Sequence, residues 1–156
     1  MAVSQAEAEQ AVSAIMKQMM GGATLAELAA IPPAEIEALY TEAYEHVQRE
    51  EFDAAIDPLL ALVISNPYDF RFQFGYALCL HQLGRTEDAA KHYGLAYVLD
   101  PSDAGCAFRL GECLAAMGDR EAATEAFESA IALCNPPGPN HEIRVASSAA
   151  LVKLNS

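Results

Sequence analysis

The sequence contains little positive charge. Its 156 residues include 9 lysines and arginines against 22 aspartates and glutamates, which gives a formal net charge of −13. Binding to nucleic acid or to an anionic membrane surface requires clustered basic side chains that pair with phosphate groups. The basic residues do not cluster, so we expect neither nucleic acid nor membrane among the partners. The excess negative charge is expected to keep an alanine-rich chain soluble.

Long apolar runs are also absent. No stretch approaches the roughly 20 apolar residues of a membrane-spanning helix. The first ten residues, MAVSQAEAEQ, lack the basic segment and the apolar run of a secretory signal. We therefore expect a cytoplasmic protein, in which the four cysteines stay reduced.

Signatures of catalytic and metal sites are missing as well. Cys106 and Cys134 have no metal-ligand spacing. The chain has no G-x-S-x-G or H-E-x-x-H motif and no phosphate-binding glycine loop. We predict that it is not an enzyme and that it needs no cofactor or metal.

What the sequence does contain is a repeat with a period of about 34 residues, which is typical of tetratricopeptide repeats. The recurring positions are Pro67 and Pro101, Gly84 and Gly118, Ala55, Ala89 and Ala123, Tyr93 and Phe127, Ala96 and Ala130, and Cys79 and Cys113. Each repeat of this kind is a pair of antiparallel helices that meet at small residues, and the two cysteines are expected to pack at equivalent places in successive pairs. One pair cannot bury its apolar face alone, so the pairs stack and the stack curves around an inner groove. We predict an all-α fold with three helix pairs in a right-handed superhelix that binds a peptide.

Turn signals give the bounds of the three pairs, which we expect at residues 33–66, 69–100 and 102–135. Gly84-Arg85 and Gly118-Asp119 mark the turns inside the second and third pairs, and the first pair has Glu50-Glu51 there instead. Pro58 is expected early in the second helix of the first pair. A proline is tolerated in the first turn of a helix and kinks it further on.

Residues 1–32 are expected to form an N-terminal helical segment. An amphipathic helix over residues 3–20 carries one apolar stripe, and Thr24 with Glu27 forms a capping box that starts a short helix. The stripe either packs on the chain's own repeats or mediates dimerisation or contact with a bound protein. The residues of the stripe are Val12, Ile15, Met16 and Met19.

Residues 136–156 are expected to form a loop and a capping helix that complete one compact domain with the repeats of residues 33–135. The segment NPPGPN cannot continue a helix. After it, residues 141–154 place Ile143, Ala146, Ala150 and Leu154 on one side, which suits a closing helix with a polar outer face.

Several segments together resemble a known family, the class II chaperones of bacterial type III secretion systems. These segments are GGATLAELAAI, EALYTEAYEHVQREEFDAAIDPL, NPYDFRFQFGYALCLHQLGRTEDAAKHYGLAYVLDP and AGCAFRLGECLAAMGDREAATEAFESAIALC. The resemblance spans about residues 21–134. It implies a cytoplasmic, acidic and often dimeric protein that keeps pore-forming translocator proteins soluble and competent for secretion. A short extended stretch of the translocator would lie in the concave groove.

The first helix of each pair is expected to line this groove. The candidate peptide-binding residues are Tyr40, Tyr44, Val47, Arg71, Phe74, Leu78, His81 and Phe108. Large rings on the inner face would form pockets for aliphatic side chains, each of which contributes about 2 kcal/mol before ordering costs. Phe52, Tyr93 and Phe127 fall at places that ordinarily pack the two helices of a pair, although the family resemblance also supports Phe52 and Tyr93 near the groove.

A generic tetratricopeptide adaptor is the alternative. Such an adaptor can clamp the C-terminal carboxylate of a partner, which requires lysine and asparagine side chains that point into the groove. At the corresponding positions the chain has Tyr40, Tyr44, Gly75, Gly105 and Arg109. Of these, Arg109 alone suits a carboxylate, so the sequence favours a groove for apolar side chains.

Overall fold

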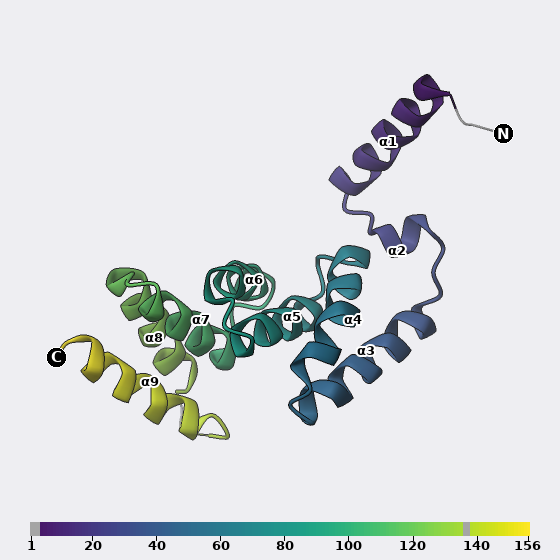
Figure 1. Cartoon of the computed structure of the whole chain (residues 1–156). Helices are drawn as coiled ribbons and strands as arrows, with labels where there is room; N and C mark the ends of the chain where they lie inside the picture. Colours follow the sequence, from purple (N-terminus) through teal and green to yellow (C-terminus); the bar gives the residue numbers. More distant parts are fainter. Residues whose placement is uncertain (1–3, 136–137) are drawn as a thin grey trace.

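The computed structural model describes residues 4–135 and 138–156, and these residues form nine helices and no strand (Figure 1). The helices are α1 (Gln5–Met20), α2 (Leu25–Leu28), α3 (Pro33–Gln48), α4 (Phe52–Ser65), α5 (Phe70–Gln82), α6 (Thr86–Leu99), α7 (Ala104–Ala116), α8 (Arg120–Leu133) and α9 (His141–Leu154). The predicted all-α fold is therefore confirmed. None of these helices is both long enough and apolar enough to cross a membrane.

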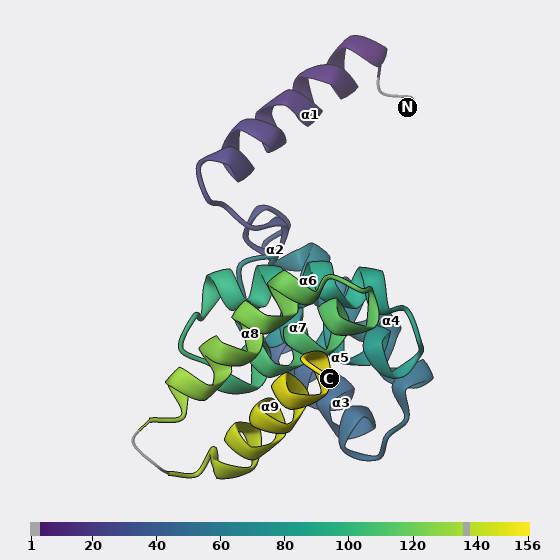
Figure 2. The ribbon, with the colours of Figure 1, turned by 90° about the vertical axis from the view of Figure 1, so that its left-hand side faces the viewer.

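Three helix pairs stack along the chain: α3 with α4, α5 with α6, and α7 with α8. Successive pairs are joined by contacts of α4 with α5 and of α6 with α7, and α9 then packs against α8 and α7. Figures 1 and 2 show the result as an arch, with α3 and α9 at its two ends and α5 and α7 between them. The inner side of the arch therefore belongs to α3, α5, α7 and α9.

Side chains and turn residues fix the ends of these helices. Asp69 and Asp103 cap α5 and α7, where their carboxylates accept hydrogen bonds from main-chain N–H groups in the first turn. Gly84 and Gly118 follow α5 and α7 with φ of 80° and 84°, a left-handed conformation that glycine adopts without strain. Glu50 takes the same place after α3 with φ of 59°, which explains why the sequence marks that turn less clearly.

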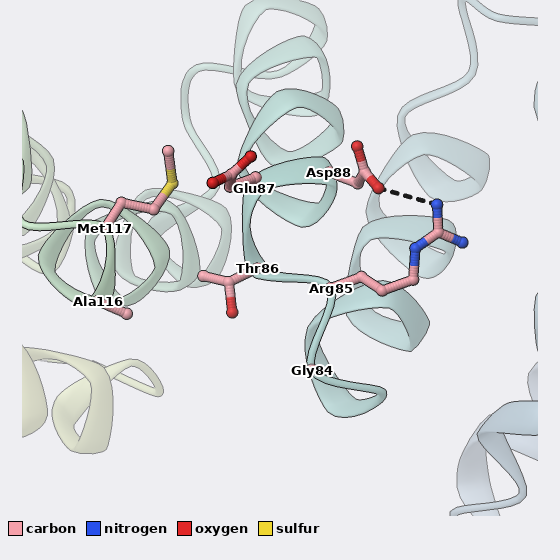
Figure 3. A pocket seen from close by; sticks show the side chains of 7 residues that line it. All are labelled: Gly84, Arg85, Thr86, Glu87, Asp88, Ala116 and Met117. Atoms are coloured by element: carbon pink, nitrogen blue, oxygen red, sulfur yellow. Dashed lines mark hydrogen bonds and ion pairs between the residues drawn. The ribbon is translucent and has the colours of Figure 1, made fainter.

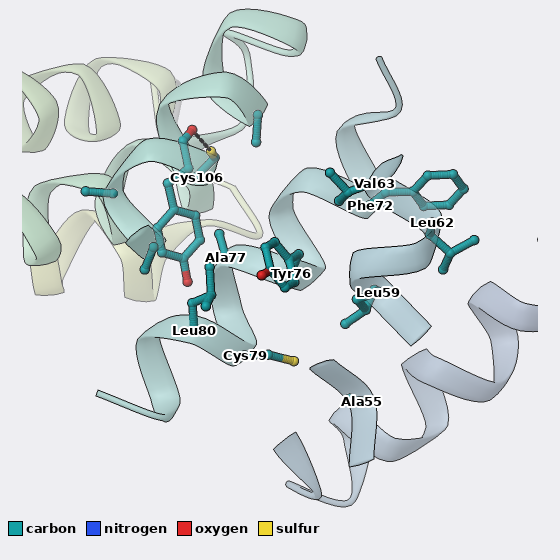
Figure 4. Packing of buried hydrophobic residues seen from close by; sticks show 14 of the residues in the cluster. Ala55, Leu59, Leu62, Val63, Phe72, Tyr76, Ala77, Cys79, Leu80 and Cys106 are labelled. Atoms are coloured by element: carbon teal, nitrogen blue, oxygen red, sulfur yellow. Dashed lines mark hydrogen bonds between the residues drawn. The ribbon is translucent and has the colours of Figure 1, made fainter. Parts of the chain in front are cut away.

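The core lies between the paired helices (Figure 4). Ala55, Ala89 and Ala123 are fully buried at 0% exposure, and Tyr93 and Phe127 are buried beside them, as the repeat pattern predicts. All four cysteines are free and buried, which confirms the packing role predicted for Cys79 and Cys113.

The position of Pro58 differs from the expectation. It is the seventh residue of α4 rather than a residue of the first turn, and it is half-buried. Because proline has no N–H, the carbonyl of Ala54 loses its usual helical partner at this point.

The two terminal helices differ in how they contact the stack. No residue of α1 is buried, and Figure 1 shows α1 extending away from the repeats. This excludes the interpretation in which its stripe packs on the chain's own repeats; the predicted first residue of that helix, Val3, lies outside the described residues. In α9, by contrast, Ser147 is buried, but the outer face is less polar than expected because Val145 and Val152 are exposed.

Candidate functional site

One recurring position places an aromatic ring on each inner helix. Tyr40 of α3, Phe74 of α5 and Phe108 of α7 occupy this position in successive repeats, and all three are half-buried. Each ring rests on a buried ring, with centroid distances of 5.6 Å from Tyr40 to Phe72, 5.6 Å from Phe74 to Tyr93, and 5.8 Å from Phe108 to Phe127. The three rings therefore form a row along the inside of the arch, and the core holds them in place.

At the Tyr40 end of this row, the inner face is covered by an ion pair between Arg71 and Glu37. The side chain of Arg71 on α5 donates two hydrogen bonds to Glu37 of α3, at 3.0 and 2.8 Å, and two to Asp69, at 3.1 and 2.8 Å. The hydrogen bonds to Glu37 and then Asp69 raise the pKa of Arg71. Its guanidinium also lies 4.8 Å from the ring centroid of Tyr40. Arg71 therefore lines the groove and covers the ring of Tyr40. Its charge is already paired with the carboxylates of Glu37 and Asp69.

The space between Phe74 and Phe108 is open. Gly105 lies 34 residues after Arg71, at the same place in the next repeat, and it has no side chain to cover the inner face. A pocket of about 340 Å³ lies here, lined by Phe74, Gly105, Phe108, Arg109, Glu142, Ile143 and Ala146. A Cβ atom at Gly105 would lie 3.8 Å from Ile143 and 3.2 Å from Oδ1 of Asp103, so a large side chain at this position would enter the pocket. The structure thus brings Phe74 and Phe108 together in one apolar pocket, which we call the central pocket.

A second pocket lies further along α7, where α7 and α8 meet α9. It measures about 450 Å³ and is lined by Glu112, Ala115, Ala116, Phe127, Ala150, Lys153 and Leu154. We call it the terminal pocket. Between the two pockets Arg109 donates to Glu112 at 2.9 Å, so this arginine is also paired. Sequence reasoning missed the terminal pocket, although the apolar face of residues 141–154 was a signal for it.

The other predicted binding residues lie outside these two pockets. Tyr44 is 49% exposed, and its ring centroid is 6.0 Å from that of Tyr40, so those two residues and Arg71 form one group. Val47, Leu78 and His81 are half-buried toward the ends of α3 and α5. Burial lowers the pKa of His81, which favours its neutral form at pH 7.

Among the residues that the structure describes, two buried side-chain polar atoms have no hydrogen-bond partner. They are Nδ1 of His81 and the hydroxyl of Tyr93, whose rings meet edge to face at 5.9 Å. Burial is also the main cause that raises the pKa of Tyr93. Tyr93 is fully buried and packs on Phe74, which agrees with the structural role that the repeat pattern favours for it.

A further pocket lies away from the inner face, beside the turn that joins α5 and α6 (Figure 3). It measures about 430 Å³, and its lining includes Glu87 and an ion pair between Arg85 and Asp88 at 2.8 Å. This charged lining does not suit an apolar side chain. Within residues 4–135 and 138–156, no group of three histidine, cysteine or acidic side chains is placed to hold a metal ion.

The apolar stripe of α1 is available to a partner. Val12, Ile15 and Met16 are 56%, 41% and 60% exposed, and Met19 is half-buried. An exposed row of large apolar side chains on one helix face is costly in water unless another surface covers it.

Two family models described as tetratricopeptide repeat match residues 40–104 and 104–136, so together they cover more than half of the chain. This chain belongs to the tetratricopeptide-repeat family. Within that family, it resembles the translocator chaperones of type III secretion in both sequence and fold.

Three relatives carry this resemblance. The "Low calcium response locus protein H" of Yersinia pestis is 29% identical over 101 residues, which is 65% of this chain and 60% of that protein. This tetratricopeptide-repeat chain is also similar to a chain in a type III secretion complex from Aeromonas hydrophila, with a TM-score of 0.84 and 26% identity. The match covers 92% of this chain and 95% of the Aeromonas chain. The Yersinia enterocolitica chaperone SycD, solved with a peptide of the translocator YopD, is similar with a TM-score of 0.75 and 25% identity. The match covers 80% of this chain and 95% of the SycD chain.

Proposed function

We propose that this protein is a cytoplasmic bacterial chaperone that binds type III secretion translocator proteins and keeps them soluble and competent for secretion. The observation that carries the proposal is the central pocket between Phe74 and Phe108 on the inner face of the arch. The likeness to SycD, which has been solved with a translocator peptide, supports a translocator as the occupant. Since the matched region is 60% of the length of the curated relative, the partner and the activity are proposals for this chain.

The chemistry of the groove suits an extended apolar segment. A side chain such as leucine or valine in the central pocket would contribute about 2 kcal/mol from burial. Two or three such side chains, together with main-chain hydrogen bonds, would reach roughly −8 kcal/mol, which is a micromolar dissociation constant. This activity is binding alone, so it needs no catalytic step, cofactor or metal.

The charges of the inner face disfavour a generic adaptor that clamps a carboxylate. Arg71 is held by Glu37 and Asp69, and Arg109 is held by Glu112. A carboxylate clamp needs cationic donors that are available to the ligand. Both inner-face arginines of α5 and α7 already have acidic partners, so the occupant is better described as apolar than as anionic.

We further propose that residues 1–32 mediate homodimerisation, that residues 33–135 bind the client, and that residues 136–156 close the stack. The exposed stripe of α1 supports the dimer, because a second copy would remove the stripe from water. One crystal structure of SycD is described as an alternative dimer, which is consistent with self-association in proteins of this kind.

A pull-down tests the proposed client. The tagged chain is expressed in a bacterium that has a type III secretion system, as wild type and as the Phe74→Ala, Phe108→Ala double variant. We expect the wild type to retain a translocator and the double variant to lose it, because the two rings form the walls of the central pocket. Gly105→Leu, which fills the pocket and removes no ring, should give the same loss.

Tyr68→Ala serves as the control, because Tyr68 is 51% exposed and lies outside the central pocket. Circular dichroism and melting are measured on every variant, since Phe74 also packs on buried Tyr93. Retention of the translocator by a folded Gly105→Leu protein would show that the central pocket does not hold it.

A further inference from the structure

We infer that α9 is part of the binding site, and that the terminal pocket between α7, α8 and α9 holds a second apolar side chain of the same client segment. This inference rests on the proposed function and extends it to residues outside the three repeats. It assigns α9 a role in recognition in addition to closing the stack.

One face of α9 lines both pockets. Ile143 and Ala146 belong to the central pocket, and Ala150 and Leu154 belong to the terminal pocket. All four residues are half-buried although α9 is the last helix of the stack. Part of each of these side chains therefore faces the pockets of about 340 and 450 Å³ instead of packing fully against α7 and α8.

The terminal pocket is well defined by its surroundings. Its floor is Phe127, which is 1% exposed and lies against Gly111, where an added Cβ atom would approach the ring to 2.7 Å. Arg120 of α8 donates to the main-chain carbonyl of Leu154, and Arg144 donates to Asn135 at 2.7 Å. These two bonds connect both ends of α9 to α8 and the residues that follow it, so the wall of the pocket is held in position.

The shape of the joint between α7 and α9 fits an extended chain better than a helix. α7 and α9 contact each other, so the space between them is limited to the two pockets of about 340 and 450 Å³. A whole helix is about 10 Å in diameter, which is wide for such pockets. An extended segment could lie over the joint and place single side chains in each pocket. Arg109 lines the central pocket and Glu112 lines the terminal pocket, and the hydrogen bond between them makes the two pockets neighbours along α7, so one segment can reach both.

The helix geometry gives the spacing of the two client side chains. The α7 residues that line the two pockets are about seven positions apart, such as Phe108 and Ala115. At a rise of 1.5 Å per residue this is roughly 10 Å. An extended chain covers about 3.3 Å per residue, so the two apolar side chains should be roughly three residues apart.

A selected peptide tests the inference and does not require the identity of the client. Short random peptides are displayed and selected on the immobilised wild-type chain, and the tightest peptide is synthesised with a fluorescent label. Its affinity is then measured for Ala150→Trp, which fills the terminal pocket, and for Ala149→Trp. Ala149 is the matched control because it is the adjacent residue on α9 and is exposed.

We expect Ala150→Trp to weaken binding about tenfold or more, because it excludes one apolar side chain, and Ala149→Trp to leave binding unchanged. Equal affinity of the two tryptophan variants, with binding lost in Gly105→Leu, would overturn the role of the terminal pocket and leave the proposed groove intact. Failure to select any peptide, or full binding by Gly105→Leu, would instead contradict the proposed function.

A spectroscopic measurement covers the case in which Ala150→Trp does not fold. The methyl signals of Leu154 and Ile143 in the wild-type chain are followed by NMR while the peptide is added. Both are expected to shift, since one lines each pocket. A shift of Ile143 with an unchanged Leu154 would show that the peptide stops at the central pocket, against the inference.

Discussion

At the scale of single residues, small side chains decide how closely the helices of a pair approach. Gly111 and Gly94 are both helical glycines, but their surroundings differ. A Cβ atom at Gly111 would lie 2.7 Å from the ring of Phe127, whereas nothing lies within 4 Å of the corresponding point at Gly94. The same substitution should therefore have opposite effects at the two positions.

We predict that Gly111→Ala destabilises the protein by about 1–3 kcal/mol, because the buried ring of Phe127 cannot move away without overpacking its neighbours. Gly94→Ala should stabilise it by up to about 1 kcal/mol through helix propensity. Urea unfolding followed by circular dichroism measures both changes. Stabilisation by Gly111→Ala would show that the α7–α8 contact is looser than these distances indicate.

Residue identities alone do not reveal how Arg71 and Gly105 divide the groove. The sequence predicts that Tyr40, Arg71, Phe74 and Phe108 lie on the inner helices, and the structure places them there. It does not predict that Arg71 pairs with Glu37 of the preceding repeat and covers Tyr40. Such pairing depends on side-chain reach between neighbouring repeats, which a period in the sequence does not contain. Their role in peptide binding stays a prediction.

At the scale of helices, periodicity predicts the elements well. The repeat period, the capping box of Thr24 and Glu27, and the glycine turns all agree with the observed helix bounds. The pattern is less informative about what each terminal helix touches. An apolar stripe has the same appearance in the sequence whether it faces the core, a pocket or a partner. This is why the exposure of α1 and the pockets beside α9 had to come from the structure.

The exposed stripe of α1 leads to a prediction about self-association. We expect the wild-type chain to be a dimer in solution and Ile15→Lys to be a monomer, because a charge in the stripe would be buried in the interface. Light scattering after size exclusion gives the mass of each. The melting temperature of the repeats should change little at high dilution, since no residue of α1 is buried in the chain itself.

Gln10→Lys is the matched control for this experiment. Gln10 is exposed on the opposite face of α1, so the variant adds the same charge without placing it in the stripe. If Ile15→Lys and wild type have the same mass, or if Gln10→Lys dissociates as well, the stripe does not form the dimer contact.

At the scale of the whole molecule, the arch is a stack in which each pair contacts its neighbours in sequence. The pair of α5 and α6 has α4 on one side and α7 on the other, whereas α3 and α9 are the ends. In such a stack, stability is approximately the sum of each repeat and its interfaces, so local opening begins at the ends. The inner surface also changes along the arch, from the charged bridge at Arg71 to the apolar pockets beside α9.

Amide hydrogen exchange can test both the stack and the position of the bound segment. In the free protein we expect slowest exchange in α5 and α6, faster exchange in α9, and fastest exchange in α1, which has no buried residue. Addition of the selected peptide should slow exchange in α7 and α9 more than in α3. The bound segment would bridge α7 and α9 across the two pockets, while Arg71 already covers Tyr40 at the other end. Greater protection of α3 than of α9 would place the peptide at the first repeat and contradict this orientation of the site.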